Sequence, residues 1–304
     1  MTRRPALGYA MVLTAATLWA LNGTVSKVIL KSGGITSERL TEVRATGAFL
    51  LLLVALVVWR RRTLRVRLGE LPFLAFFGIC GLAFVSWFYF VAISRLPIGI
   101  SLLIQYVAPV LVALWARYVL HEPVRRRIWV ALALSIAGLA LLLDVYHGVE
   151  LDGLGLAASL GAALTYALYI LLADRGLRTR STSSLLTYGF LFAALFWGLV
   201  QPWTSFPWDR VDESVSLLGR LAEIDLPIWL LMSWMVVLGT IVPFGLLVAS
   251  LRHITPTRAG ILAMFEPVAG TAIAYLWLRE ELDPTQLLGA IVVLGGIVLA
   301  QTAR

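Results

Sequence analysis

Two charged side chains stand inside long apolar runs, and they are the residues best suited to do chemistry. Glu266 lies near the middle of a run from Thr257 to Leu278, and Arg44 lies near the start of a run that ends at Trp59. A charge at the centre of a bilayer costs at least about 2.5–3.5 kcal/mol, so it should face a helix bundle or a wet cavity. Glu266 could bind a substrate ammonium group, carry a coupling proton or hold helices together. Arg44 could bind a substrate carboxylate, pair with Glu266 or extend to the membrane interface.

Aromatic and amide side chains inside the apolar runs are further candidates for a binding pocket. Trp and Tyr rings can cover amphiphilic or cationic substrates, and an amide in hydrocarbon needs a partner. Each of them could equally serve helix packing or an interfacial belt. The predicted substrate-binding residues are Trp19, Asn22, Arg44, Trp87, Gln105, Tyr166 and Glu266.

Two prolines lie inside apolar runs at corresponding positions. Pro109 and Pro267 each lack a backbone N–H and clash with the carbonyl four residues earlier, at Gln105 and Ala263. A bend near the middle of a membrane span is tolerated where it lines a cavity. The sequence therefore predicts two bent helices, with the prolines acting either in gating or as fixed bends.

Enzyme chemistry finds no support in the sequence. Glu266 has no catalytic companion, and the three histidines (His121, His147 and His253) fall at span ends or in loops. No zinc-protease, phosphate-loop or dinucleotide motif occurs. We therefore expect no catalytic residue, no metal site and no cofactor. A membrane-embedded enzyme of lipid or prenyl metabolism and a non-transporting membrane scaffold stay open as alternatives.

The composition requires lipid as the solvent for most of the chain. Of its 304 residues 60% are hydrophobic and 14% are charged, with a mean hydropathy of +0.89, whereas soluble domains are about 45–50% apolar and about 25% charged. The net charge of +8 comes from short arginine clusters between apolar runs. Such clusters are typical of topology determinants, and we expect no nucleic-acid partner.

A membrane span needs about 20 mostly apolar residues, and ten such runs occur. The expected fold is therefore an all-α integral membrane protein whose spans are Ala6–Ile29, Thr41–Trp59, Leu71–Ile93, Ile98–Leu120, Ile128–Leu143, Leu154–Ala173, Ser183–Val200, Pro227–Leu251, Thr257–Leu278 and Gln286–Thr302. With both termini inside, 17 of the 25 Lys and Arg residues fall on the inner side and seven on the outer side. This bias predicts a multi-pass protein of the cytoplasmic membrane with cytoplasmic termini.

The one long connection covers residues 201–226. Val211, Val215, Leu218 and Leu221 recur there at helical spacing beside charged residues. This pattern predicts a short amphipathic helix on the outer interface.

An internal repeat relates the two halves of the chain. A shift of 158 residues places Pro109 on Pro267, and a shift of 147 places Gly8 on Gly155. The halves, residues 1–147 and 148–304, hold five spans each, so the second must insert upside down within a single membrane domain. Inverted halves around a central pathway are typical of secondary transporters. The expected partners are a small-molecule substrate, the lipid bilayer, a possible coupling proton and a possible second copy of the chain.

These residues also resemble a known family. The run Leu102–Glu122 with its central Pro109, and the run Ile261–Glu281 with Phe265-Glu266-Pro267, are similar to the two repeated motifs of the EamA-type transporters of the drug/metabolite transporter superfamily. Trp19 and Arg44 also fit. The resemblance covers nearly the whole chain. It implies ten spans, cytoplasmic termini, alternating access through a central pocket, and export or exchange of amino acids or other small metabolites.

Overall fold

The protein is a bundle of long helices in the computed structural model, which describes residues 4–32, 35–93, 95–96, 98–121, 123–145, 152–279 and 281–302. In chain order the helices are α1 (Pro5–Ser32), α2 (Ser37–Trp59), α3 (Leu71–Phe76), α4 (Phe84–Ile93), α5 (Ile98–Gln105), α6 (Ala108–Tyr118), α7 (Arg126–Leu142), α8 (Gly153–Gly176), α9 (Thr182–Val200), α10 (Ile228–Val236), α11 (Val242–Ser250), α12 (Pro256–Ala263), α13 (Phe265–Ile273) and α14 (Pro284–Thr302).

Every predicted span coincides with one of these helical segments. Nine segments of the described chain are long and apolar enough to cross a membrane. The remaining one, α7, has 17 residues and packs along α14. The all-α membrane class is therefore confirmed, whereas a count of ten membrane crossings stays a prediction. The predicted boundary at residues 147 and 148 and His147 lie outside the described residues.

Several spans are interrupted rather than continuous. The π-helical turns η3 (Phe77–Ala83), η7 (Val237–Ile241) and η8 (Ala274–Leu278) join α3 to α4, join α10 to α11 and extend α13. The predicted bends at the prolines are also found. α5 stops before Pro109 and α6 restarts at Ala108, while α12 stops at Ala263 and α13 restarts at Phe265. Each proline thus sits in a first helical turn, where its missing N–H costs least.

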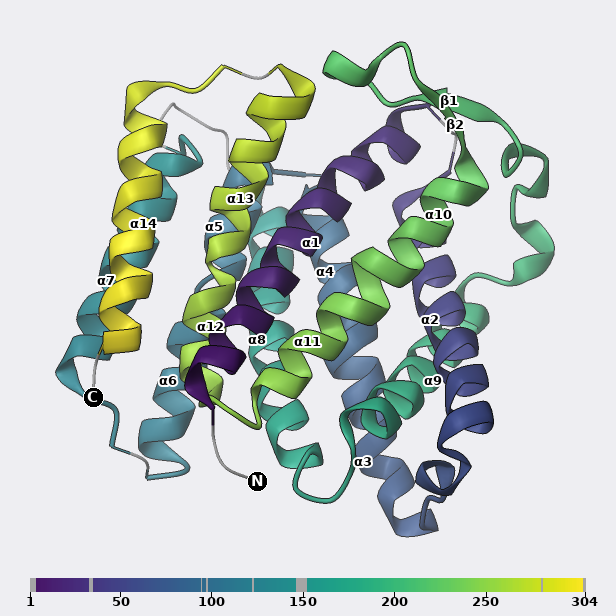
Figure 1. Ribbon diagram of the computed structural model, residues 1–304, viewed down its shortest axis with the longest axis horizontal. Helices are drawn as coiled ribbons and strands as arrows, with labels where there is room; N and C mark the ends of the chain where they lie inside the picture. The colour runs from purple at the N-terminus through teal and green to yellow at the C-terminus, as the bar shows by residue number, and fades with distance from the viewer. Residues whose placement is uncertain are drawn as a thin grey trace.

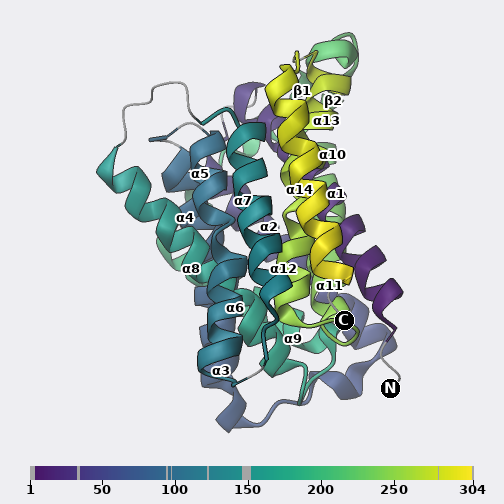
Figure 2. The same cartoon turned by 90° about the vertical axis from the view of Figure 1, so that its left-hand side faces the viewer.

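α1 lies at one face of the bundle and packs against α11, α12 and α13 (Figure 1). α8 packs against α4, α5 and α6, and α2 lies along α9. α7 and α14 form a pair at one side of the bundle (Figure 2). Their backbones meet at Gly138, Gly289 and Gly296, where an added Cβ would collide with the facing helix. Small residues allow this close approach between helices in lipid.

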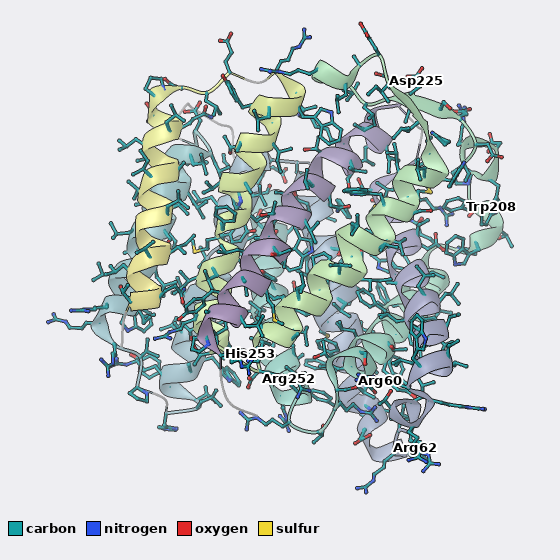
Figure 3. The ribbon with its side chains drawn as sticks, viewed as in Figure 1. Arg60, Arg62, Trp208, Asp225, Arg252 and His253 are labelled. Carbon is teal, nitrogen blue, oxygen red and sulfur yellow. The ribbon has the colours of Figure 1, made fainter. Side chains whose placement is uncertain are left out.

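The two ends of the bundle differ in charge. α1 begins and α14 ends at the same end, here called the termini end (Figure 1). Arg60, Arg62 and Arg252 also lie there, whereas Trp208 and Asp225 lie at the opposite end, here called the hairpin end (Figure 3). The connection that follows α2 and the one that follows α9 are therefore at opposite ends, as two inverted halves require.

The connection from α9 to α10 does not form the predicted amphipathic helix. It contains the short 3-10 turns η4 (Trp203–Ser205), η5 (Trp208–Arg210) and η6 (Gly219–Leu221), and an antiparallel hairpin of β1 (Ser214–Ser216) and β2 (Asp225–Pro227). Three prolines interrupt the segment. Its apolar side chains pack over the ends of α1 and α10 in one buried cluster, with Val215 and Leu217 facing inward. These apolar residues are therefore buried by tertiary packing and do not form an interfacial helix.

Candidate functional site

Glu266 and Tyr106 connect the two broken spans. Glu266 lies in the first turn of α13, directly after the break at Met264. Tyr106 lies in the turn between α5 and α6, and its hydroxyl donates a hydrogen bond of 2.7 Å to Oε2 of Glu266. The ring of Tyr106 is buried and Glu266 is half-buried. The equivalent breaks of the two halves thus meet at a carboxylate.

The helix break also explains how a carboxylate is tolerated at this depth. The first N–H groups of a helix have no partner within the helix, and the N-terminus carries a partial positive charge. Because α13 begins at Phe265, Glu266 stands at this favourable end. Restarting the helix beside Pro267 therefore offsets part of the cost of the charge.

One hydrogen bond, made by Nε, orients the guanidinium of Arg44. Its Nε donates to Oγ1 of Thr240 at 3.1 Å. Its two terminal nitrogens make no hydrogen bond to any residue that the structure describes. Arg44 and Glu266 interact electrostatically, yet no ion pair joins them among the described residues. The site therefore presents two opposite charges that do not neutralise each other by direct contact.

A chain of aromatic rings lines the space between the helices. Tyr106 meets Tyr166 edge-on at 6.4 Å between ring centroids, and Tyr166 stacks on Tyr169 at 6.3 Å. Phe244 packs edge-on against Tyr169 at 5.4 Å and against Trp19 at 5.1 Å. The rings come from α1, α8, α11 and the α5–α6 break, so both halves of the chain contribute to one wall.

Several buried polar atoms around this wall have no hydrogen-bond partner among the described residues. They are Oδ1 of Asn22, Oε1 of Gln105 and the hydroxyls of Tyr166 and Tyr169. A buried polar group left unsatisfied costs about 1–3 kcal/mol. Such groups are therefore suited to bind the polar atoms of a substrate.

The free volume at the site is small. A cavity of about 10 Å³ lies beside Arg44 and is lined by Thr240, Phe244 and Trp197 among others. One water molecule needs at least about 10–15 Å³ of such volume. This cavity therefore leaves no room for a substrate beside Arg44, and binding there requires the helices to separate.

Six of the seven predicted substrate-binding residues lie along this network. Trp19 reaches it through Phe244, Asn22 lies against Gly239 next to Thr240, and Gln105 precedes Tyr106. Arg44, Tyr166 and Glu266 are described above. The structure does not bring Trp87 to the network: it is 40% exposed on α4 and packs on Phe84 and Phe88.

The sequence prediction left out two residues that hold the charges. Tyr106 was visible as a polar aromatic residue close to Pro109, yet nothing in the sequence paired it with Glu266. Thr240 could not be recognised as a site residue from the sequence, because its contact with Arg44 depends on a π-helical turn that the local sequence does not specify. Among the described residues, no group of three or more His, Cys, Asp and Glu side chains is arranged to hold a metal ion.

Comparison with known proteins places this geometry in a family. The model of the EamA-like transporter family matches residues 6–144 and 153–302, one match for each half. The chain is 27% identical to the uncharacterised transporter YwfM of Bacillus subtilis, over 96% of this chain and 93% of that one. It is 30% identical to the threonine/homoserine exporter RhtA of Escherichia coli K12, over 88% and 79%.

A solved crystal structure has the same fold. It superposes with a TM-score of 0.77 over 98% of this chain and 97% of the other, at 18% sequence identity. The resemblance to EamA-type transporters inferred from the two Pro-containing motifs is thus confirmed.

Proposed function

This chain belongs to the EamA-like transporter family, and from that premise we propose that it exports or exchanges small amino acids. Transport proceeds by alternating access through the central site. The observation that carries the proposal is the pair formed by Arg44 and Glu266, two opposite charges with unoccupied hydrogen-bonding positions in one closed site.

The two charged residues match the two charged groups of an amino acid. The terminal nitrogens of Arg44 form a planar fork that can bind a carboxylate through two parallel hydrogen bonds. Oε2 of Glu266 accepts from Tyr106, and Oε1 makes no hydrogen bond to the residues described. That oxygen suits an ammonium group. Zwitterions with a short separation between carboxylate and ammonium are therefore the substrates favoured by the site.

The relatives support the same substrate class. RhtA is named for threonine and homoserine, two small polar amino acids. The unsatisfied hydroxyl and amide groups of Asn22, Gln105 and Tyr166 could bind a hydroxyl on such a side chain.

The proposed orientation follows the charge at the two ends. Arginines concentrate at the termini end, as the positive-inside rule requires of a cytoplasmic face. The termini are therefore placed in the cytoplasm and the hairpin end outside, in the cytoplasmic membrane. Movement from the termini end to the hairpin end is export.

The proposal is tested by counterflow in sealed liposomes that hold the purified protein. We expect labelled L-threonine to exchange against unlabelled L-threonine, and Arg44→Gln to abolish this exchange while the protein stays folded. Arg178→Gln is the matched control, because Arg178 is an exposed arginine whose nearest acid is Asp174, one helical turn away. No exchange of any amino acid by the wild-type protein, or full exchange by Arg44→Gln, would show that the proposal is wrong.

A further inference from the structure

Arg44 is oriented by the buried hydroxyl of Thr240. Thr240 is 1% exposed, and its Oγ1 accepts the hydrogen bond from Nε of Arg44. Only the outer fork of the guanidinium, formed by the two terminal nitrogens, is left for another group. The hydrogen bond from Nε to Thr240 therefore decides which edge of the Arg44 guanidinium faces a substrate.

The π-helical turn η7 fixes the hydroxyl of Thr240 in this role. Oγ1 of Thr240 donates to the carbonyl of Met235, five residues earlier, at 2.9 Å. In an α-helix a threonine hydroxyl bonds a carbonyl three or four residues earlier. Because its proton is used on Met235, the oxygen of Thr240 faces Arg44 as an acceptor.

The neighbouring glycine keeps the same turn close to α1. A Cβ at Gly239 would collide with the side-chain amide of Asn22, which is itself buried. Single π-helical turns occur frequently at functional sites. Here the turn brings Asn22, Thr240 and Arg44 side by side.

We propose that Thr240 is a positioning residue that sets the preference of the site for a carboxylate group, an inference that rests on the proposed function. With Thr240 in place, the fork of Arg44 is aimed at the substrate and binds a carboxylate through two hydrogen bonds. Without the hydroxyl, the guanidinium rotates among several orientations, and the advantage of a carboxylate over an uncharged amide falls.

The test compares L-threonine with L-threoninamide as competitors of counterflow. We expect Thr240→Val to raise the KM of L-threonine about tenfold, the order of one lost hydrogen bond, with little change for the amide. Thr240→Ser should restore the preference. Thr187→Val is the control, since Thr187 is an equally buried threonine whose hydroxyl bonds only the carbonyl of Ser183. Thr240→Ala serves if the valine variant does not fold.

The outcomes separate this inference from the proposed function. If Arg44→Gln keeps full exchange of L-threonine, the proposed function is wrong. If Arg44→Gln abolishes exchange and both Thr240→Val and Thr240→Ala keep the preference for the carboxylate, only the role of Thr240 is overturned. Thr240 would also have only a structural role if Thr240→Val weakened the binding of L-threonine and L-threoninamide equally. The same holds if Thr240→Ser did not restore the preference.

A separate set of contacts joins α2 and α9 at both ends of the bundle. At the hairpin end, Arg39 of α2 is buried and pairs with Glu42 at 2.6 Å. It also donates to the carbonyls of Gln201 and Pro202 and, at 2.6 Å, to the hydroxyl of Ser205, all in the connection that follows α9. We call these contacts the hairpin-end latch.

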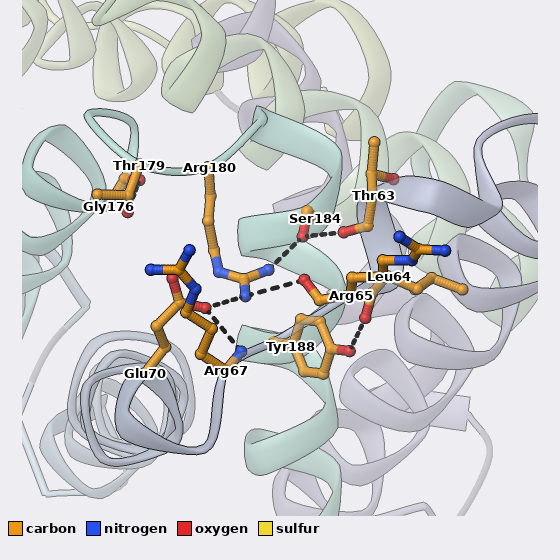
Figure 4. Close-up of polar contacts among 10 residues, drawn as sticks. All are labelled: Thr63, Leu64, Arg65, Arg67, Glu70, Gly176, Thr179, Arg180, Ser184 and Tyr188. Atoms are coloured by element: carbon orange, nitrogen blue, oxygen red, sulfur yellow. Dashed lines mark hydrogen bonds and ion pairs between the residues drawn. The ribbon is translucent and has the colours of Figure 1, made fainter.

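The termini end carries a matching set of contacts (Figure 4). Arg180, just before α9, pairs with Glu70 and donates to the hydroxyl of Ser184 at 2.7 Å. It also donates to the carbonyl of Arg65, and Ser184 donates to the carbonyl of Thr63, both in the connection that follows α2. We call these contacts the termini-end latch.

The two latches lie at corresponding places in the two halves, although their arginines are not at equivalent positions: Arg39 lies in the first turn of α2, and Arg180 precedes Ser181, the N-cap of α9. In each latch, an arginine at the start of the second span of one half donates hydrogen bonds to backbone carbonyls. These carbonyls belong to the connection that follows the second span of the other half. Each guanidinium also lies over an aromatic ring, Arg39 over Phe206 at 6.0 Å and Arg180 over Tyr188 at 5.2 Å. An arginine at the start of α2 therefore binds the connection that follows α9, and an arginine just before α9 binds the connection that follows α2.

We infer that the two latches open in alternation during transport. The contacts of both latches are formed in this structure. Opening one end requires its arginine to release the carbonyls of the partner connection, while the other latch keeps the opposite end shut.

Hydrogen–deuterium exchange of the purified protein tests this inference. Arg180→Gln should speed exchange of the amides in residues 60–67 and slow exchange in residues 201–206, and Arg39→Gln should do the reverse. Arg178→Gln, on an exposed arginine at the termini end, is the control. An effect confined to the mutated end, or faster exchange at both ends, would overturn the alternation and leave two local contacts. Arg39→Lys and Arg180→Lys provide milder variants if glutamine prevents folding.

Discussion

Replacing Glu266 by glutamine is the change that most directly tests the central site. Glutamine keeps the shape of the side chain and removes the charge, so it imitates a permanently protonated acid. One oxygen of Glu266 accepts a hydrogen bond of 2.7 Å from Tyr106, and the other is available to a substrate. The substitution therefore acts on the link between the broken spans and on the proposed ammonium position together.

The expected size follows from these two contacts. Hydrogen bonds to charged groups contribute about 1.5–3 kcal/mol and neutral ones about 0.5–1.5 kcal/mol. The bond from Tyr106 thus weakens by about 1 kcal/mol, whereas a substrate ammonium loses about 1.5–3 kcal/mol. Affinity should fall about 10- to 150-fold, since about 1.4 kcal/mol is a factor of ten. Stability should be kept, because the variant no longer buries a charge.

Three measurements on one purified variant decide among the roles of Glu266: transport driven by a pH gradient, exchange between equal pools, and folded yield with thermal stability. An ammonium ligand predicts that both transport modes fail and affinity drops. A proton carrier predicts that only pH-driven transport is lost. A structural carboxylate predicts low yield with normal turnover. Asp174→Asn, at a partly exposed acid that pairs with Arg178 away from the central site, is the control. Normal values for all three would remove Glu266 from the site.

Three further predictions concern the frame around the site. Cysteines placed at Ser214 and Thr63 should react with an impermeant reagent from opposite faces of the membrane, and labelling from one face would contradict inverted halves. Pro109→Ala and Pro267→Ala should slow turnover more than they lower folded yield; unchanged turnover in both would make the prolines passive bends. Gly289→Ala should lower the unfolding free energy by about 1–3 kcal/mol through overpacking against the α7 backbone, and an unchanged melting temperature would argue against the tight α7–α14 contact.

The membrane helices were predictable because the information is local. A span is a stretch of apolar residues of sufficient length, and no distant contact is needed to recognise it. The helix breaks were predictable for the same reason, since proline acts on the hydrogen bond of its own turn. The π-helical turns were not, because residues such as Gly239 are compatible with an ordinary helix until the neighbouring α1 is in place.

The connection from α9 to α10 shows where local patterns mislead. Val211, Val215, Leu218 and Leu221 do recur at helical spacing. However, Val215 is a buried residue of the hairpin itself, Leu221 is exposed, and Leu218 has a positive φ of 63°. The apolar face that suggested an interfacial helix packs instead on the ends of α1 and α10. Only the tertiary structure provides that surface.

The central site was predictable in its charges and not in its contacts. An acid or arginine in hydrocarbon is conspicuous in sequence, and both Glu266 and Arg44 lie in the interior of the bundle. The partners Tyr106 and Thr240 are 160 and 196 residues away from them along the chain. Trp87 was predicted for the site and lies outside it, because a tryptophan in a span can equally pack on the outer surface of the bundle.

Substrate binding and helix bending meet at the same atoms. Tyr106 lies in the break between α5 and α6, and Glu266 lies directly after the break between α12 and α13, so their hydrogen bond joins one broken span from each half. A ligand shifts a conformational equilibrium only by its difference in affinity between the two states. On the function proposed above, a substrate ammonium bound to the Glu266 carboxylate would weaken its hydrogen bond to Tyr106 and let the two bends move apart. The charge of the substrate would then favour the opening that releases it.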